Sequence, residues 1–301
     1  MKTKQTHQAR AFTIIELLTV MSIIVVLIGM LVPALSQVRK YAMGVQQAAQ
    51  LKAISAGLEM FKNDYDNEYP DSGALDTSQN REDYCGAMKL AEAMMGRDLL
   101  GFHPRSRFWA AATDGNRALY QQGIPSPQDL QRNLRERKGT YIPPDNANAY
   151  RLANLYPGSI GPFDDTNGDL YVLCDVFKRN VNSGTGDNKI GMPVLYFKAN
   201  SGGITHDPND GPQLSKLNNG INYYNIYDND ELVKLGKPDG SARHTLASDF
   251  GRDESDFYEM TRNRQIDTAL RPYREDTFIL ISAGWDGEYG TGDDVTNFDI
   301  N

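Results

Sequence analysis

The feature that most constrains this chain is a nearly unbroken apolar run at residues 10–35, which holds a single acidic residue, Glu16. A run of this length is about long enough to cross a bilayer as one helix. Lys2, Lys4 and Arg10 precede the apolar core of the run, and such basic flanks stay on the cytoplasmic side. The pattern predicts one membrane span with the N-terminus in the cytoplasm. A charge inside a span costs on the order of 3 kcal/mol, so we expect Glu16 to have a partner or a task.

The start of this run resembles the N-terminus of type IV prepilins and type II secretion pseudopilins. In that family a short basic leader ends before a Phe-Thr-x-x-Glu segment, where a membrane peptidase cuts the chain and the new N-terminus is methylated. The resemblance implies cleavage between Ala11 and Phe12, which makes Glu16 the fifth mature residue, the family's acidic position. Pro33 falls at mature position 22, where pilins commonly have a helix-kinking proline. The family usually has Gly before the cut, and Ala11 is also small.

The resemblance also implies what Glu16 does. In an assembled fibre the spans pack as a helical bundle, and the fifth-residue carboxylate pairs with the amine of a neighbouring subunit's first residue, which neutralises a buried charge. The alternative is a plain signal anchor whose glutamate lies near the headgroups. A cleaved secretory signal fits less well, because the apolar run is too long and more helical pattern follows it.

The apolar pattern continues beyond the membrane-length run with three- and four-residue spacing, which indicates a helix with one buried stripe. The stripe residues are Leu51, Ile54, Leu58, Phe61 and Tyr65. We expect one helix over residues 12–65, roughly 80 Å long, with a membrane-spanning half at 12–35 and an amphipathic half at 36–65. A sheet packed on the stripe is its natural cover.

The expected fold class is therefore α+β and pilin-like: a long N-terminal membrane-spanning helix packed on a C-terminal antiparallel sheet domain with helical and loop insertions. Residues 1–11 form the leader, and residues 66–301 form one extracytoplasmic globular domain. Within it, apolar spacing and capping residues predict helices at 82–96, 127–137, 146–156 and 229–235. Aliphatic and aromatic runs predict strands at 170–177, 192–198 and 277–283. Residues 200–250 are polar and are expected to form a long exposed loop region.

Charge and cysteine content narrow the possible partners. The formal charge is -8, and loss of the leader with its three basic residues makes it -11. An acidic surface argues against nucleic acid, because phosphate binding needs a basic footprint, and it is compatible with cation binding. Cys85 and Cys174 would both lie outside the cytoplasmic membrane, where a disulfide is permitted but not required. Two small buried thiols are the alternative.

A glycine-rich loop at residues 281–297 follows the last predicted strand and carries several oxygen ligands of the kind that calcium prefers. Its glycines let the chain turn these oxygens inward. The loop resembles the calcium loop of the major pseudopilin of type II secretion. Carried over, the resemblance implies calcium bound by the side chains of Ser282, Asp286 and Asp294, with carbonyls near Ile281 and Val295, and with Asp293 as a substitute for Asp294. A polar turn capped by aspartates is the alternative. A weaker calcium candidate lies at residues 164–169.

Three functions stay open. The leading one is a structural subunit of a type II secretion pseudopilus or type IV pilus-like fibre in the cytoplasmic (inner) membrane, with its C-terminal domain in the periplasm or outside the cell. Its expected partners are other subunits, a prepilin peptidase/methyltransferase, an inner-membrane assembly platform and the lipid bilayer. The second is a minor or tip adhesive pilin whose enlarged middle region binds a protein or carbohydrate. The third, a membrane-anchored enzyme, is disfavoured because a tether needs no buried carboxylate and because the sequence has no P-loop, HExxH, G-x-S-x-G or dinucleotide motif.

Overall fold

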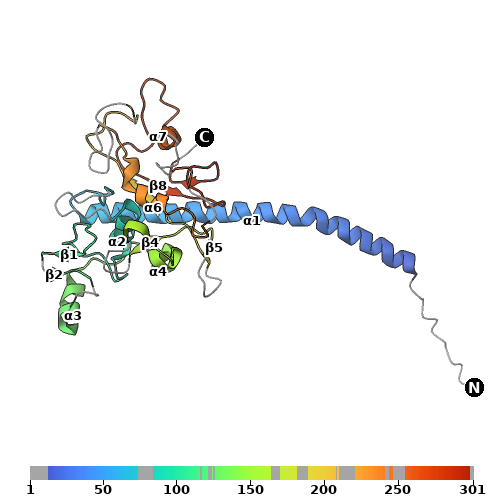
Figure 1. The fold of residues 1–301 in the computed structure, drawn as a ribbon, viewed down its shortest axis with the longest axis horizontal. Helices are drawn as coiled ribbons and strands as arrows, with labels where there is room; N and C mark the ends of the chain where they lie inside the picture. Colours follow the sequence, from blue (N-terminus) through green and yellow to red (C-terminus); the bar gives the residue numbers. More distant parts are fainter. Residues whose placement is uncertain are drawn as a thin grey trace, which may run out of the picture. The chain divides into compact units, whose positions relative to one another are not determined.

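The computed structural model describes residues 13–73, 84–115, 117–120, 124, 126–163, 170–181, 189–207, 209, 221–240, 244–246 and 255–298. The chain divides into two compact units, Met1–Met43 and Gly44–Asn301. Helix α1 (Ile14–Asp64) contributes residues to both units. The fold is α+β, with one long apolar N-terminal helix and small antiparallel sheets (Figure 1).

In the first unit, α1 is apolar on every side from Leu17 to Leu35, apart from the hydroxyls of Thr19 and Ser22. Its large apolar side chains are exposed to solvent along the helix, with relative exposures of 83% for Ile14, 43% for Ile24 and 64% for Val38. A helix that is apolar on every side suits a lipid environment. Among the described residues, α1 is the one helix that is long and apolar enough to cross a membrane, judged by length and composition.

In the second unit, the C-terminal part of α1 carries the predicted stripe. Leu51, Ile54, Leu58 and Phe61 are at most 3% exposed, and Tyr65 packs partly buried beside them. Phe61 lies edge-on to Phe102, with the ring centroids 5.0 Å apart. Burial confirms the apolar stripe that the sequence predicts, and the buried part of α1 begins at Gln47.

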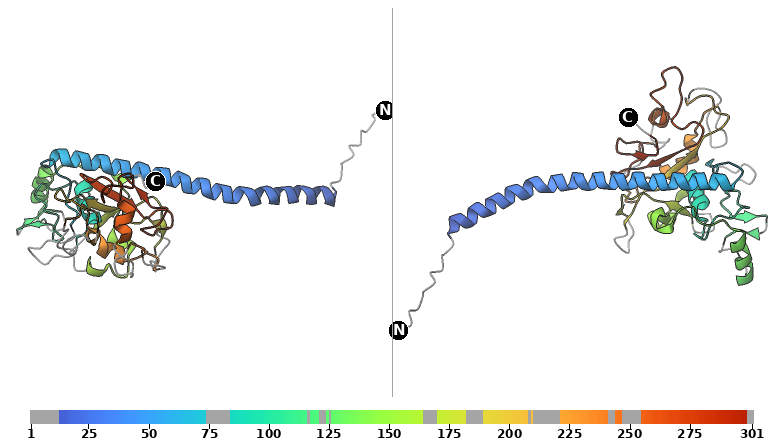
Figure 2. Two further views of the ribbon diagram at one scale, coloured as in Figure 1. Left: turned by 90° about the horizontal axis from the view of Figure 1, so that it is seen from above. Right: turned by 180° about the vertical axis from the view of Figure 1, so that it is seen from behind.

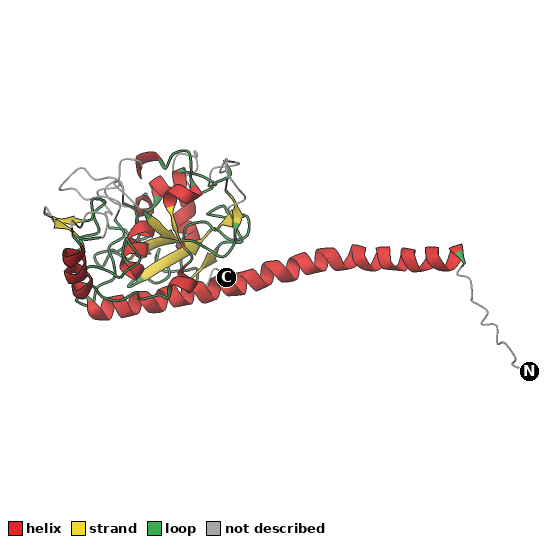
Figure 3. Cartoon of the chain, turned by 90° about the horizontal axis from the view of Figure 1, so that it is seen from below, coloured by secondary structure: helices red, strands yellow, loops and turns green. Residues whose placement is uncertain are grey.

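The main sheet has the strand order β7-β8-β9 and is antiparallel throughout. Its strands are β7 (Leu195–Lys198), β8 (Phe278–Ser282) and β9 (Val295–Thr296). The register places Tyr196 opposite Leu280 and Ser282 opposite Val295. Figure 3 shows these strands surrounded by helices and loops. Every residue of β8 is buried, because both faces of the sheet are covered.

The two faces of the sheet lead into two hydrophobic clusters, since successive side chains of a strand point to opposite faces. On one face, Tyr196, Phe278 and Leu280 pack with the α1 stripe and with helix α2 (Gly86–Met95). On the other face, Ile279 and Ile281 pack with α7 (Ser255–Thr261) and with the 3-10 helix η3 (Ile226–Asp228). The sheet therefore forms a middle layer between α1 and the C-terminal helices.

The described residues also form three two-stranded ladders and several short helices outside the main sheet. The ladders pair β1 (Thr113–Asp114) with β2 (Arg117–Ala118), β3 (Ala149–Arg151) with β4 (Tyr171–Leu173), and β5 (Arg179–Asn180) with β6 (Lys189–Ile190). The remaining helices are α3 (Pro127–Glu136), α4 (Pro144–Ala147), α5 (Leu152–Leu155), η2 (Gly161–Phe163) and α6 (Asp230–Lys234). Figure 2 shows the same elements from two further directions.

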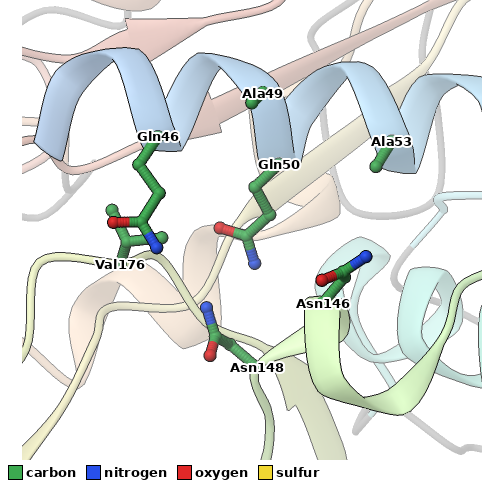
Figure 4. A pocket seen from close by; sticks show the side chains of 7 residues that line it. All are labelled: Gln46, Ala49, Gln50, Ala53, Asn146, Asn148 and Val176. Carbon is green, nitrogen blue, oxygen red and sulfur yellow. The ribbon is translucent and has the colours of Figure 1, made fainter. Parts of the chain in front are cut away.

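Two buried glutamines fix α1 to the segment after β4. Gln50 Nε2 donates to the Cys174 carbonyl at 2.9 Å, and Gln47 Oε1 accepts from the Val176 amide at 2.9 Å. Beside them lies a small polar hollow that Gln46, Gln50, Asn146 and Asn148 line (Figure 4). The glutamines satisfy backbone groups that have no strand partner, while Gln47 Nε2 and Gln50 Oε1 are themselves buried without a hydrogen-bond partner.

The side chain of Asn229 links α2 to the sheet by two hydrogen bonds. Asn229 is fully buried, its Oδ1 accepts from the Ala87 amide at 2.8 Å, and its Nδ2 donates to the Tyr196 carbonyl at 2.7 Å. The contact is close, since a Cβ added at Gly86 would lie 2.2 Å from the Tyr196 oxygen. Glycine at this position therefore lets the start of α2 approach β7.

The structure confirms the helices predicted at 12–65, 82–96, 127–137 and 229–235 and the strands predicted at 170–177, 192–198 and 277–283, all with shorter bounds. The single helix predicted at 146–156 is wrong. Asn148 adopts a left-handed conformation with φ 46°, which ends α4, and Ala149–Arg151 then pairs with β4 before α5 begins. The short helix α7 has no counterpart in the sequence prediction. The exposed loop predicted at 200–250 is wrong for part of its described residues, because 222–226 and 228–230 are buried in the core.

Candidate functional sites at the start of α1 and in the C-terminal loop

The first turn of α1 is closed by Thr13 and Glu16. Glu16 Oε2 accepts from the Thr13 hydroxyl at 2.8 Å and from the Thr13 amide at 2.9 Å, while Thr13 Oγ1 accepts from the Glu16 amide at 3.2 Å. This reciprocal arrangement is a capping box, and it satisfies amides that no helical carbonyl can reach. The Thr-x-x-Glu spacing carries this information in the sequence.

The predicted cleavage junction, Ala11 and Phe12, lies outside the described residues, as does the basic leader. Pro33 lies inside α1, which continues as one α-helix on either side of it. The carbonyl of Pro33 accepts from the Ser36 hydroxyl at 2.7 Å. Glu16 and Pro33 therefore occupy the same helix, as the sequence predicts.

In the C-terminal loop, the side chain of Asp293 links the turn after β8 to the end of the loop by hydrogen bonds. Its Oδ2 accepts from the Trp285 amide at 2.8 Å and the Asp286 amide at 3.1 Å, and its Oδ1 accepts from the Thr291 hydroxyl. Gly284 has φ 60°, and a Cβ there would lie 2.1 Å from the Asp293 carbonyl oxygen. Glycine is therefore required where the two ends of the loop meet.

Asp294 differs from its neighbour. Its Oδ2 accepts from the Gly290 amide at 2.8 Å, whereas its Oδ1 is buried without a hydrogen-bond partner. Burial raises the pKa of Asp294 to about 8, and the nearby carboxylates of Asp286 and Asp293 add to the shift. Burial also raises the pKa of Asp286, and the nearby Asp293 adds to this shift. The loop thus holds three carboxyl groups close together, and ionising all three at once is unfavourable.

The other predicted ligands lie on the adjoining strands. Ser282 and Val295 face each other in the β8–β9 ladder, and Ile281 pairs with Thr296. The Ser282 hydroxyl donates to Asp175 Oδ2 at 3.2 Å. Arg179 donates from Nη2 to the Gly284 carbonyl. Asp175 and Arg179 support the loop from more than 100 residues away, and no local pattern marks them.

The C-terminal loop offers carboxylate, hydroxyl and carbonyl oxygens as possible ligands for a cation. Within the described part of the chain, no group of three or more His, Cys, Asp and Glu side chains is arranged to hold a metal ion. A calcium shell at this loop would therefore depend on two aspartates completed by hydroxyl, carbonyl and water oxygens, which calcium accepts. The buried, unpartnered Oδ1 of Asp294 fits such a shell. The weaker candidate at 164–169 lies outside the described residues.

Cys85 and Cys174 are both free and buried. They belong to the same hydrophobic cluster, and burial raises the pKa of the Cys85 thiol to about 11 and that of Cys174 further above its usual value. In this structure the two thiols are unbridged, and a buried free thiol packs as a small apolar side chain.

Comparisons of this chain with protein-family models, with curated proteins and with solved structures found no match in any of the three.

Proposed function

We propose that this chain is a structural subunit of a type II secretion pseudopilus or type IV pilus-like fibre. The observation that carries the proposal is α1 itself: a 51-residue helix that begins in the Thr13–Glu16 capping box, is exposed and apolar through its first unit, and ends in a stripe buried against an antiparallel sheet. A simple membrane tether needs neither the acidic residue nor the second half of the helix. A subunit that packs helix against helix uses both.

In this proposal α1 inserts into the cytoplasmic membrane with its N-terminus inside, and the second unit lies in the periplasm or outside the cell. A prepilin peptidase cleaves between Ala11 and Phe12 and the new amine is methylated. Glu16 then pairs with the first residue of a neighbouring subunit as the helices gather, while Pro33 adapts the helix to the bundle. Pairing the two charges inside the helix bundle avoids the cost of an unpaired charge in lipid, and this favours packed helices over isolated spans.

We also propose that the C-terminal loop takes a structural calcium ion. Asp286 and Asp294 would hold it, with the Ser282 hydroxyl, carbonyls near Ile281 and Val295, and Asp293 as the substitute for Asp294. Two observations support it: burial and repulsion from nearby carboxylates raise the pKa of Asp286 and of Asp294, and one oxygen of Asp294 is buried without a partner. A cation would offset that repulsion and fix the loop against β8.

The experiment that tests the fibre proposal is coexpression with a prepilin peptidase and the assembly platform of such a system, followed by mass spectrometry and fibre preparation. We expect a mature chain starting at Phe12 and a sheared fraction that pellets as filaments. A peptidase-inactive host is the control. A chain that keeps Met1 and never enters the sheared fraction, while a known subunit does both, would contradict the proposal.

A second function, a minor or tip adhesive pilin, is favoured by the segments between α2 and β7. The ladders β1–β2 and β3–β4 and the helices α3, α4 and α5 stand outside the main sheet. A subunit confined to the end of a fibre could bear them on a free surface. Immunogold labelling distinguishes the two functions, since label only at fibre ends favours the tip subunit.

A further inference from the structure

Charge is distributed unevenly in the second unit. Residues 97–138, here called the basic arm, contain eight Lys or Arg and four Asp or Glu, a net charge of +4. Because the formal charge of the whole chain is -8, the remainder of the chain carries a net charge of -12. In Figure 1 the labelled elements of the arm, β1, β2 and α3, lie together at one edge of the second unit, apart from β8.

The acidic residues of the arm are already engaged within it. Asp98 pairs with buried Arg137, and Asp114 lies 3.7 Å from Arg105. Asp129 lies 3.5 Å from Arg132, and Glu136 lies 3.2 Å from Arg117. No carboxylate of the arm thus remains to neutralise its excess arginines. Arg107 and Arg135 are both exposed, and the guanidinium of Arg107 stacks over Trp109 with a separation of 5.3 Å from the ring centroid.

Helix α3 presents this excess charge on its outer face. Its inner face is anchored by Asn133, which donates to the Leu119 carbonyl at 3.1 Å and accepts from Arg137. The opposite face forms a shallow hollow of about 430 Å³. Its lining residues are Pro127, Gln128, Gln131, Arg132 and Arg135. No described carboxylate of the arm pairs with Arg135, and Arg132, which lies 3.5 Å from Asp129, is its neighbour on the same helix face. Guanidinium groups suit carboxylates, which they bind in a bidentate manner.

We infer that the outer face of α3 docks on the acidic surface of a second copy of this chain. The inference rests on the proposed fibre, which places copies side by side. Charge complementarity selects the occupant, because 35 of the 39 acidic residues lie outside the arm. The contact joins two different surfaces, so each copy can use its arm on one neighbour and its acidic surface on another. Such heterologous contacts build open filaments rather than closed dimers.

Nucleic acid is the other polyanion that such an arm could attract. The arm projects from a chain of net charge -8, and this overall field repels a duplex at a distance. Binding of a DNA duplex is therefore included in the experiment as an outcome that overturns the inference.

The test uses the full chain purified in a nonionic detergent, with self-association measured by sedimentation velocity at about 20 mM and about 0.5 M salt, where the Debye length falls from roughly 20 Å to several Å. Association between membrane helices does not depend on salt, so only the salt-sensitive part reports on the arm. We expect the wild-type chain to associate at low salt and the Arg132→Glu/Arg135→Glu variant to associate about tenfold more weakly or not at all.

The matched control is Lys189→Glu/Arg264→Glu, which makes the same charge change at two exposed positions outside the arm. It should associate like the wild type. A labelled arm variant should still bind the wild-type chain, since its acidic surface is intact, although it no longer binds itself. Circular dichroism verifies that each variant is folded.

Wild-type self-association that does not change with salt, equal loss in the control, or arm-dependent binding of a DNA duplex at 0.15 M salt would each overturn the inference. The measurement needs neither peptidase nor assembly platform. Failure of the fibre proposal, seen as absent processing and absent filaments, is therefore distinguishable from failure of the docking surface.

Discussion

Glu16 accepts two hydrogen bonds from Thr13, one from its hydroxyl at 2.8 Å and one from its amide at 2.9 Å. The carboxylate thus starts the helix in its own chain before it meets any neighbour. The proposed fibre asks it to do something else as well, namely to neutralise the first amine of another subunit. These two tasks depend on different properties of the side chain, its hydrogen-bond acceptor and its charge.

Glu16→Gln and Glu16→Ala separate the two tasks. Glutamine keeps the capping acceptor and removes the charge, whereas alanine removes both. We expect both variants to insert into the membrane at least as well as the wild type, because a charge has been removed from the span. Both should give fewer fibres, measured by quantitative immunoblotting of the sheared fraction.

Thr13→Ala is the control, since it weakens the capping box by about 1 kcal/mol and keeps the charge. Wild-type fibre yield from Glu16→Gln would contradict the pairing role and leave capping as the function of Glu16.

Calcium should stabilise the second unit. An ion that binds only the folded chain adds RT ln(1 + [L]/Kd), roughly 2.7 kcal/mol at about 100-fold above Kd. We expect a higher melting temperature of the detergent-solubilised chain in millimolar calcium than in chelator, by differential scanning fluorimetry. Asp286→Ala or Asp294→Ala should remove this difference, while Asp267→Ala, an exposed aspartate outside the loop, should preserve it. Identical curves with calcium and with chelator would reduce the loop to an aspartate-capped turn.

Asp228 should make stability depend on pH. Burial raises its pKa to about 7, Asp71 adds to the shift, and the hydrogen bond from Ser72 opposes it. Between about pH 4 and pH 7 the folded chain therefore holds a proton that the unfolded chain has lost, so the free energy of unfolding falls as pH rises. This fall in the free energy of unfolding is at most about 4 kcal/mol, and it is complete above about pH 7.

Asp228→Asn should remove this contribution, because the amide oxygen still accepts from Ser72 and does not titrate. Urea unfolding at pH 5 and pH 8 gives the free energies of unfolding of wild type and variant. The difference between the two proteins at each pH removes the effect of titrating groups that they share. We expect the variant to gain stability relative to wild type at pH 8. An equal difference at both pH values would show that Asp228 does not titrate in this range.

Asn229→Ala should strongly destabilise the second unit. The substitution leaves the Ala87 amide and the Tyr196 carbonyl buried without partners, and each such group costs about 1–3 kcal/mol. Asn209→Ala is a matched control at an exposed asparagine. A loss below about 0.5 kcal/mol in urea unfolding would show that water replaces the side chain and that α2 does not depend on this contact.

The local elements of this protein could be predicted from its sequence because their causes are local. The α1 stripe repeats with helical spacing, and Ser126 accepts from the Asp129 amide to begin α3, as the capping pattern indicates. The Thr13–Glu16 box is equally local and could have been found. The break at Asn148 could not, because pairing with β4 overrides the helical preference of residues 146–156.

What only the tertiary structure decided are the contacts between distant parts of the chain. Gln50 reaches the Cys174 carbonyl across 124 residues, Asn229 reaches Ala87 across 142, and Arg179 reaches the Gly284 carbonyl across 105. In each case a buried backbone group without a ladder partner is satisfied by a side chain that folding brings to it. Spacing along the sequence determines which face of a helix or strand is apolar. It does not determine which distant polar group that face will meet, because that depends on how the layers pack.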